Sequence, residues 1–197
     1  MNETGRRMLV NSIAYIARFT EDRPIAPVHS PFAGAKWVTP KGLRKWMLQY
    51  KDSFDYYVAK FDPAAIAHLK PHKLENILAW IDAELPYLGM APDGSITLIG
   101  EAKDLGVDLA AADLPDRIAT LCAAKETATT AAALAAKVIV GAPSGLEPQA
   151  WAAWIKESRP YLFHAPQSGA RWFLDPLAKK RQVPTKDLRG PARADRR

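Results

Sequence analysis

Apolar residues recur along this chain at the three- and four-residue intervals of an α-helix, and they predict a mainly helical protein. Residues 2–19 are expected to form a first helix, whose apolar face carries Leu9, Ile13 and Ile16. Residues 41–61 repeat this spacing and are expected to break near Asp52 and Ser53. Their bulky groups are Trp46, Tyr50, Tyr57 and Phe61.

Prolines mark the limits of these helices. Residues 21–40 form an expected extended connector, because it contains four residues that lack a backbone N–H group and clash inside a helix: Pro24, Pro27, Pro31 and Pro40. Thr39 and Pro40 then suit the start of the second helix. Asp62 and Pro63 suit the start of a third, since proline is favoured at the first helical position.

A phrase of fourteen residues occurs twice. Residues 79–92 are AWIDAELPYLGMAP, and residues 153–166, 74 positions further on, are AWIKESRPYLFHAP. Eight of the fourteen aligned positions are identical: Ala79/Ala153, Trp80/Trp154, Ile81/Ile155, Pro86/Pro160, Tyr87/Tyr161, Leu88/Leu162, Ala91/Ala165 and Pro92/Pro166. After a turn that is two residues longer in the second copy, the match resumes with Leu98/Leu174, Ala102/Ala178, Lys103/Lys179 and Val107/Val183.

Each copy predicts the same short series of elements. A helix with an Ala-Trp-Ile sequence is stopped by proline, and an extended Tyr-Leu piece follows. A turn with glycine (PDG, then PQSG) then leads into a short strand and a short helix. A unit of this size cannot close a core of its own, so the copies are expected to pack against each other or against a flanking helix.

The predicted fold class is therefore α+β, mainly α, with a tandem duplicated helix–turn–strand–helix unit and a preceding helical region that packs against it. The expected divisions are N-terminal helices with the proline-rich connector, a first copy, an alanine-rich helical spacer with a hinge, a second copy and a disordered basic tail. In the same order, they span residues 1–62, 63–122, 123–145, 146–190 and 191–197.

Composition narrows the class of protein. With 48% hydrophobic and 24% charged residues, the chain resembles an ordinary globular protein. No run approaches the roughly 18 apolar residues of a membrane-spanning helix. Because no signal peptide is convincing, a cytoplasmic location is expected by default, or an exported one if the chain is a fragment of a longer precursor. The single Cys122 excludes an internal disulfide framework and a multi-cysteine zinc site.

The net charge of +6 is concentrated at the C-terminal end. Residues 171–197 hold nine Lys or Arg against three Asp, which leaves residues 1–170 formally neutral. Such a tail attracts nucleic acid or an anionic membrane surface by Coulomb attraction and counterion release. A solvated C-terminus without a binding role has the same composition.

The sequence predicts no catalytic, cofactor or metal site. His68 and His72 have the spacing of two ligands on one helix face, but a proline lies between them. Ser144 lacks the G-x-S-x-G pattern of a nucleophile elbow, and no glycine-rich phosphate-binding motif occurs. Asp82 and Glu84 have the composition of an acid–base pair, yet the second copy has no carboxylate at either position.

The second copy departs from the first at positions where it carries larger or charged side chains. We expect a partner-binding surface there, formed by Arg159, Phe163, His164, Arg171 and Trp172. His164 stands where the first copy has Met90, so a role for it is specific to the second copy. The repeated Trp and Tyr residues are instead expected to anchor the core.

Two segments resemble known families. Residues 2–19, NETGRRMLVNSIAYIARF, resemble the closing helix of ThuA-like or class I glutamine-amidotransferase-like α/β domains, in which a pattern N-x-x-G-R-x-L-L-x-N-A-I follows the last strand. This segment contains no catalytic position, so the resemblance carries no activity. It implies that the chain is the C-terminal part of a longer protein.

The second copy is similar to regions of large uncharacterised proteins of planctomycete-type bacteria. The similarity rests on W-x-x-W-I-x-x-x-R-P-Y-L, F-L-D-x-x-A-K and V-P-T-K-D-L-R-G, at residues 151–162, 173–179 and 183–190. This family implies no activity. The first copy departs from its pattern, with Leu85 in place of Arg159 and Ile99 in place of Asp175.

Together these features favour a non-catalytic interaction or accessory module, the C-terminal part of a larger bacterial protein. Its expected partner is another protein or an upstream domain of the same chain, with no cofactor. One alternative is a binder of nucleic acid or an anionic surface through the basic tail. Another is a cap or docking domain of an enzyme whose active site lies upstream of Met1.

Overall fold

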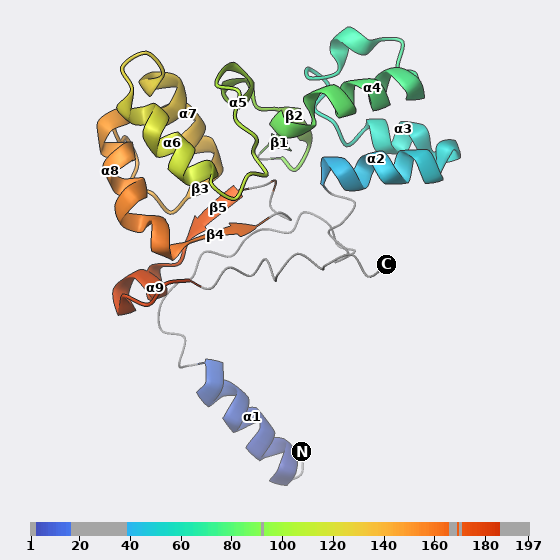
Figure 1. The fold of residues 1–197 in the computed structure, drawn as a ribbon. Helices are drawn as coiled ribbons and strands as arrows, with labels where there is room; N and C mark the ends of the chain where they lie inside the picture. The colour runs from blue at the N-terminus through green and yellow to red at the C-terminus, as the bar shows by residue number, and fades with distance from the viewer. Residues whose placement is uncertain (1–2, 17–38, 92, 166–168, 170, 186–197) are drawn as a thin grey trace, which may run out of the picture.

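The computed structural model of this chain describes residues 3–16, 39–91, 93–165, 169 and 171–185 (Figure 1). Within them the protein is mainly helical and has one two-stranded and one three-stranded sheet, which confirms the predicted α+β, mainly α class. None of the helices in these ranges is both long and apolar enough to cross a membrane.

Helices α2 (Pro40–Gln49) and α3 (Phe54–Val58) form the outer part of a first lobe. Thr39 caps α2, because its hydroxyl accepts a hydrogen bond from the backbone N–H of Gly42 at 3.1 Å. The helical stretch breaks where the sequence predicts, at the 3₁₀ helix η2 (Lys51–Ser53). The inward face of the two helices is buried and consists of Leu43, Met47, Tyr57 and Val58.

The α-helix predicted to begin at Asp62 is absent, and this segment forms turns and the 3₁₀ helix η3 (Ala67–Leu69) instead. The prediction is wrong because Asp62 is tied to a strand. Its backbone N–H donates to Ile96 O at 2.8 Å, and its carboxylate accepts from the Thr97 hydroxyl at 3.0 Å. The carboxylate also accepts from Ala64 N at 2.9 Å, which closes a local turn.

The two copies fold into the same order of elements. The first consists of α4 (Leu74–Glu84), η4 (Leu85–Tyr87), β1 (Leu88–Met90), β2 (Ile96–Leu98) and α5 (Gly100–Asp104). The second consists of α8 (Pro148–Ser158), η5 (Arg159–Tyr161), β4 (Leu162–Ala165), β5 (Arg171–Leu174) and α9 (Pro176–Arg181). Both hairpins are antiparallel, and their registers correspond: Leu88 lies opposite Leu98, and Leu162 opposite Leu174.

The copies also share a set of backbone hydrogen bonds. The tyrosine carbonyl accepts from the residue after the second strand, at 2.9 Å both for Ile99 N to Tyr87 O and for Asp175 N to Tyr161 O. The proline carbonyl accepts from the segment after the last helix, at 2.9 Å for Leu109 N to Pro86 O and 2.8 Å for Thr185 N to Pro160 O. The duplicated sequence therefore builds one backbone frame twice.

The repeated lysine keeps its position in this frame. Lys103 Nζ lies 2.6 Å from Glu84 Oε1. Lys179 Nζ lies 3.2 Å from the hydroxyl of Ser158, the counterpart of Glu84, and 2.9 Å from Glu157 Oε1. In each copy the lysine ties the last helix back to the end of the first helix.

The residues between the two sets of repeat elements pack into the second lobe, and they include the end of the expected first copy (63–122) and the expected helical spacer and hinge (123–145). Helices α6 (Leu114–Ala123) and α7 (Ala128–Val138) pack together, and Ala131, Leu134 and Ala135 of α7 are 0% exposed. Strand β3 (Ile139–Val140) pairs in parallel with β5, which gives the sheet order β3-β5-β4. Small alanine side chains let α7 approach its neighbours closely. Helix propensity predicts that this segment is helical but not that it is buried.

Two clusters of buried side chains form the core, one in each lobe. Figure 1 shows the helices and strands of the two lobes. The first cluster lies among α2, α3, α4 and the β1–β2 hairpin, and the second among α5 to α8 and the three-stranded sheet. The first copy contributes to both: Leu88 and Ile96 belong to the first cluster, while Ile99 and Ala102 belong to the second. Its hairpin is therefore the wall between the two lobes.

The two parts of the N-terminal region differ in how they pack: α2 and α3 contribute to the core, whereas the described apolar side chains of α1 are exposed. The expected packing against the duplicated unit holds for α2 and α3, whose buried residues share a cluster with α4. Helix α1 (Glu3–Ile16) matches the helix expected at 2–19 over its described length. Its described apolar side chains do not pack in the same way, since Met8, Leu9 and Val10 are 67%, 50% and 62% exposed.

The lobes also meet at the tip of the β4–β5 hairpin. Gly169 has a φ of +75°, and a Cβ atom placed on it would overlap severely with Met90 Cβ and lie 3.0 Å from Met90 N. The backbone conformation at this position also disfavours side chains. Position 169 therefore accepts only glycine without a shift of one lobe against the other.

Replacing Gly169 by alanine tests this contact. Gly145 is the matched control, because its φ of +71° is similar but a Cβ atom there would meet nothing within 4 Å. We expect Gly145→Ala to lower the free energy of unfolding by about 1 kcal/mol, the cost of a left-handed alanine. Gly169→Ala should cost a further ~1–3 kcal/mol from overpacking. Equal losses in urea denaturation would show that the hairpin tip does not press on β1.

Candidate binding site

The second copy encloses a cavity of about 230 Å³ between η5, the β4–β5 hairpin and the segment after α9. Pro184 and Thr185 form one wall, held in place by the hydrogen bond from Thr185 N to Pro160 O. Four of the five residues predicted to bind a partner line this cavity: Arg159, Phe163, His164 and Trp172. The fold thus gathers residues that are up to thirteen positions apart in the sequence.

Trp172 forms the base of the cavity. It is 1% exposed and therefore belongs to the core, although the sequence predicted it to be part of the partner-binding surface. Its strand position pairs it with His164 on β4, and the centroids of the two rings lie 5.3 Å apart. The buried indole therefore supports the imidazole from the neighbouring strand.

Arg159 is held by three groups. Its Nε donates to Asp116 Oδ2 at 2.9 Å, its Nη2 donates to Ala112 O at 3.2 Å, and its guanidinium carbon lies 5.1 Å from the centroid of the Trp172 ring. The side chain is 32% exposed. Arg159 thereby fixes η5 to the start of α6. Sequence reasoning missed this role, because Asp116 is 43 positions away and lies beyond the aligned positions of the repeat.

Arg171 lies on the other face of the hairpin. Alternation along β5 places Arg171 and Phe173 on one side and Trp172 on the opposite side. The Arg171 guanidinium carbon lies 5.9 Å from the Phe173 centroid, and the Phe163 ring stacks on Phe173 at 5.7 Å. The five predicted residues thus form two groups on the two faces of one hairpin. Phe163 belongs to both, since it lines the cavity and also stacks on Phe173.

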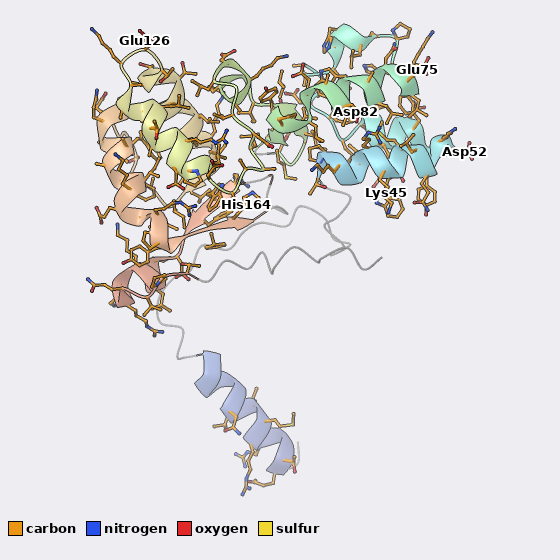
Figure 2. The ribbon with its side chains drawn as sticks, in the orientation of Figure 1. Lys45, Asp52, Glu75, Asp82, Glu126 and His164 are labelled. Atoms are coloured by element: carbon orange, nitrogen blue, oxygen red, sulfur yellow. The ribbon has the colours of Figure 1, made fainter. Side chains whose placement is uncertain are left out.

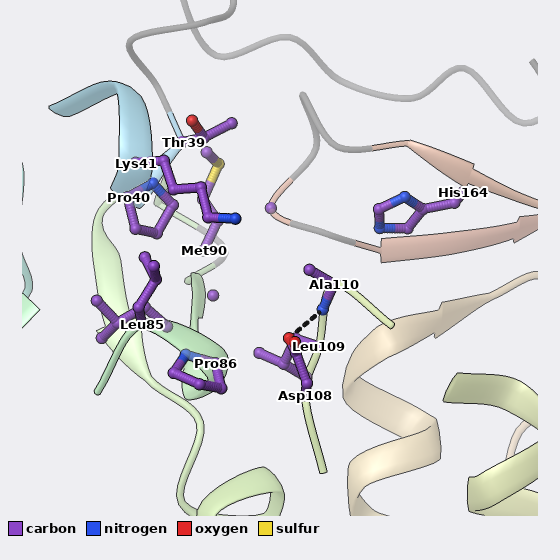
Figure 3. Close-up of a pocket in the computed structure, with 13 residues that line it drawn as sticks. Thr39, Pro40, Lys41, Leu85, Pro86, Met90, Asp108, Leu109, Ala110 and His164 are labelled. Carbon is purple, nitrogen blue, oxygen red and sulfur yellow. Dashed lines mark hydrogen bonds between the residues drawn. The ribbon is translucent and has the colours of Figure 1, made fainter. Parts of the chain in front are cut away.

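The first copy contains a cavity at the corresponding place, with a volume of about 240 Å³ (Figure 3). Seven of the eight positions that line the second-copy cavity have counterparts in its lining: Leu85, Pro86, Leu88, Gly89, Met90, Asp108 and Leu109. The exception is Ile96, the counterpart of Trp172. The shared backbone frame therefore produces the same hollow twice.

The two cavities differ in chemistry and in what surrounds them. Where the second copy has Arg159, Phe163 and His164, the first has Leu85, Gly89 and Met90. The first-copy cavity is also bounded by the start of α2 and by the second hairpin, through His164 and Gly169. His164 lines both cavities, and Figure 2 shows it at the edge of the second lobe that faces the first.

Cys122 and His68, two other residues considered for catalysis or metal binding, pack against neighbouring side chains of the fold. Cys122 is 0% exposed, and burial raises the pKa of its thiol to about 11, which removes the reactive thiolate near neutral pH. His68 packs against the Trp80 ring with centroids 6.3 Å apart. No cluster of His, Cys, Asp and Glu suited to a metal ion occurs among the residues that the structure describes.

Asp82 and Glu84 form ion pairs with different partners. Asp82, on the side of α4 toward α2 (Figure 2), accepts a hydrogen bond from Arg44 Nη2 at 2.8 Å, and this interaction lowers the pKa of Asp82. Glu84 is bound to Lys103. The two carboxylates therefore do not share a reacting site, which is against an acid–base pair.

The end of the basic tail lies outside the described residues. Of its nine cations, Arg171, Lys179, Lys180 and Arg181 are described, and Lys179 is already paired with Glu157. Binding of nucleic acid or an anionic surface through the basic tail stays a prediction. No protein-family model, no curated protein and no solved structure matches the chain, so the geometry of the two cavities is the basis for any functional proposal.

The Arg159–Asp116 contact can be measured by a double-mutant cycle. We expect Arg159→Leu, which installs the first-copy residue, to cost about 1 kcal/mol of unfolding free energy from the ion pair and the ring contact together. With Asp116→Asn the coupling should be ~0.5 kcal/mol and should fall with added salt. The exposed Arg7–Glu3 pair, four residues apart on α1, is the control and should couple more weakly. No coupling between Arg159 and Asp116 would contradict the assignment.

The pKa of Asp82 gives a second test. Because the folded-state pKa is lowered, the Arg44 interaction contributes stability above the unfolded pKa of about 3.9 and loses it as pH falls through the folded value. We expect Arg44→Gln to raise the pKa of Asp82 toward about 3.9 in a carbon-detected NMR titration. The pKa of Asp113, which Arg117 lowers, should not move. An unchanged pKa of Asp82 would show that the ion pair does not form in solution.

Proposed function

We propose that this protein is a non-catalytic interaction module and that the second-copy cavity receives its partner. The partner is another protein, or an upstream domain of a longer bacterial chain of which this is the C-terminal part. The supporting observation is that one backbone frame carries two cavities with different side chains. Since the first copy folds with Leu85, Gly89 and Met90, the frame itself does not require Arg159, Phe163 and His164.

The size of the cavity favours one anchoring side chain over a small-molecule ligand. Ligand pockets for drug-sized molecules usually measure about 300–1,000 Å³, whereas this cavity measures about 230 Å³. Aromatic and arginine residues are enriched where protein interfaces have their strongest contacts. An aromatic side chain of the partner would lie between the half-buried Phe163 and the Arg159–Trp172 pair.

The electrostatic setting fits a neutral or weakly acidic anchor. Arg159 is partly neutralised by Asp116, and Arg171 lies on the other face of the hairpin, so among the described residues that line the cavity Arg159 is the one arginine or lysine. Phe163 connects the cavity with the Phe173–Arg171 face. A partner with an aromatic anchor and a neighbouring carboxylate would contact both groups of predicted residues.

The test reverses two residues of the second copy to those of the first, Arg159→Leu with His164→Met. The matched control makes the same changes in the first lobe, Arg44→Leu with His68→Met, where neither residue lines the cavity and Arg44, like Arg159, is paired with an aspartate. Proteins retained by the immobilised chain from source-cell extract are quantified by mass spectrometry, and the Kd of each specific partner is then measured by calorimetry. We expect at least about tenfold weaker binding for the reversed variant alone, the usual effect of losing a strong contact.

Two outcomes would contradict the proposal. The first is a partner that binds the reversed variant and the control equally well. The second is the absence of any saturable partner, combined with an intact mass in source cells that equals that of the 197-residue chain. A larger mass would identify an upstream domain, and the same two variants would then be tested for docking to it.

A further inference from the structure

The first-copy cavity combines an apolar floor with charged groups of both signs (Figure 3). The floor is formed by Leu85, Pro86, Leu88, Met90 and Leu109. Leu88, Met90 and Leu109 are 3%, 9% and 2% exposed, so this surface is fixed by the core and not by mobile side chains. The cavity therefore offers a preformed site for an apolar group.

Two charged side chains lie on opposite sides of this floor. Lys41, in the first turn of α2, extends over the cavity, and Asp108 lies across from it (Figure 3). Asp108 Oδ1 accepts a hydrogen bond from Ala110 N at 2.8 Å, which leaves its second oxygen for another donor. Both side chains are exposed, and neither forms an ion pair with any residue in the described ranges, while Asp108 also interacts electrostatically with Arg117.

We infer that this cavity binds a small zwitterion with an apolar body, which is the chemistry of an apolar α-amino acid. Its ammonium group would donate to Asp108, and its carboxylate would contact Lys41. The N-terminal end of α2, a ten-residue helix, also favours the carboxylate. The apolar side chain would cover Leu109 and Met90.

Charge and size together select this class of ligand. A simple carboxylate supplies no donor to Asp108, and a simple amine supplies no acceptor to Lys41, so each makes one charge-assisted contact fewer than a zwitterion. A cavity of about 150 Å³ holds benzene, so about 240 Å³ accommodates a branched or aromatic side chain with its charged end but not a drug-sized molecule. This inference concerns a different cavity from the proposed partner site and does not rest on it.

The experiment measures three probes on the full chain by calorimetry. L-leucine, 4-methylpentanoate and 3-methylbutylamine share one apolar body, and the last two each lack one charged group. We expect L-leucine to bind at least about tenfold more tightly than either of the others, since each lost charge-assisted hydrogen bond has an effect of this size. Equal binding of all three, or no binding of L-leucine, would overturn the inference.

Charge variants assign each contact. Lys41→Met should reduce the affinity for L-leucine to the level of 3-methylbutylamine on the unchanged protein. Asp108→Asn should reduce it to the level of 4-methylpentanoate. Asparagine keeps an oxygen that accepts from Ala110 N, so the local turn is preserved. Lys45→Met, at an exposed position on the same helix, is the control and should change nothing. Unchanged binding in both charge variants would contradict the assigned roles.

A filling variant locates the site. Ala110 is exposed at the edge of the cavity, and Ala110→Phe should occupy the space and abolish L-leucine binding. Ala64→Phe is the matched control, because Ala64 is also exposed and its N–H is bound in the same way, to Asp62 Oδ1 at 2.9 Å. Binding that survives Ala110→Phe would place the ligand elsewhere and overturn the inference.

Discussion

The carbonyl groups of Pro86 and Pro160 hold the two copies in shape. Each proline lies in the 3₁₀ helix that follows the first α-helix of its copy, and its carbonyl oxygen accepts a hydrogen bond from a chain segment that returns after the last helix, through Leu109 N or Thr185 N. This bond ties the returning segment to the 3₁₀ helix and thereby fixes its path. The hairpin, the short helix and the cavity between them all depend on it.

Because the two copies share one backbone frame, a comparison of their residues shows which side chains the frame requires and which it does not. Both copies form the same hairpin register and the same hollow, yet one hollow is lined by Leu85 and Met90 and the other by Arg159 and His164. The contact of Arg159 with Asp116 shows that a changed residue also acquires new structural partners. Divergence between copies is thus a guide to binding, although it does not by itself distinguish a ligand contact from a packing contact.

The sequence predicted the fold class, the cap at Thr39 and the break near Ser53, because each depends on local periodicity and on proline, which act over a few residues. It missed contacts made over long separations. The turn at Asp62 depends on Ile96, and the burial of α7 depends on α6 and α8. For the candidate site, four of the five predicted residues line one cavity, but the burial of Trp172 follows from its place in a three-stranded sheet that the sequence did not reveal.

The position of the first hairpin also determines how the protein unfolds. Leu98 packs against the core cluster of the first lobe, and the next residue, Ile99, is buried in that of the second. Neither cluster can open without exposing one side of the same short segment to water, so the two lobes cannot behave as independent cooperative units. Amide hydrogens on β2 would therefore exchange only in the global opening of the molecule, and the slowest-exchanging protons would lie at its centre instead of in either lobe alone.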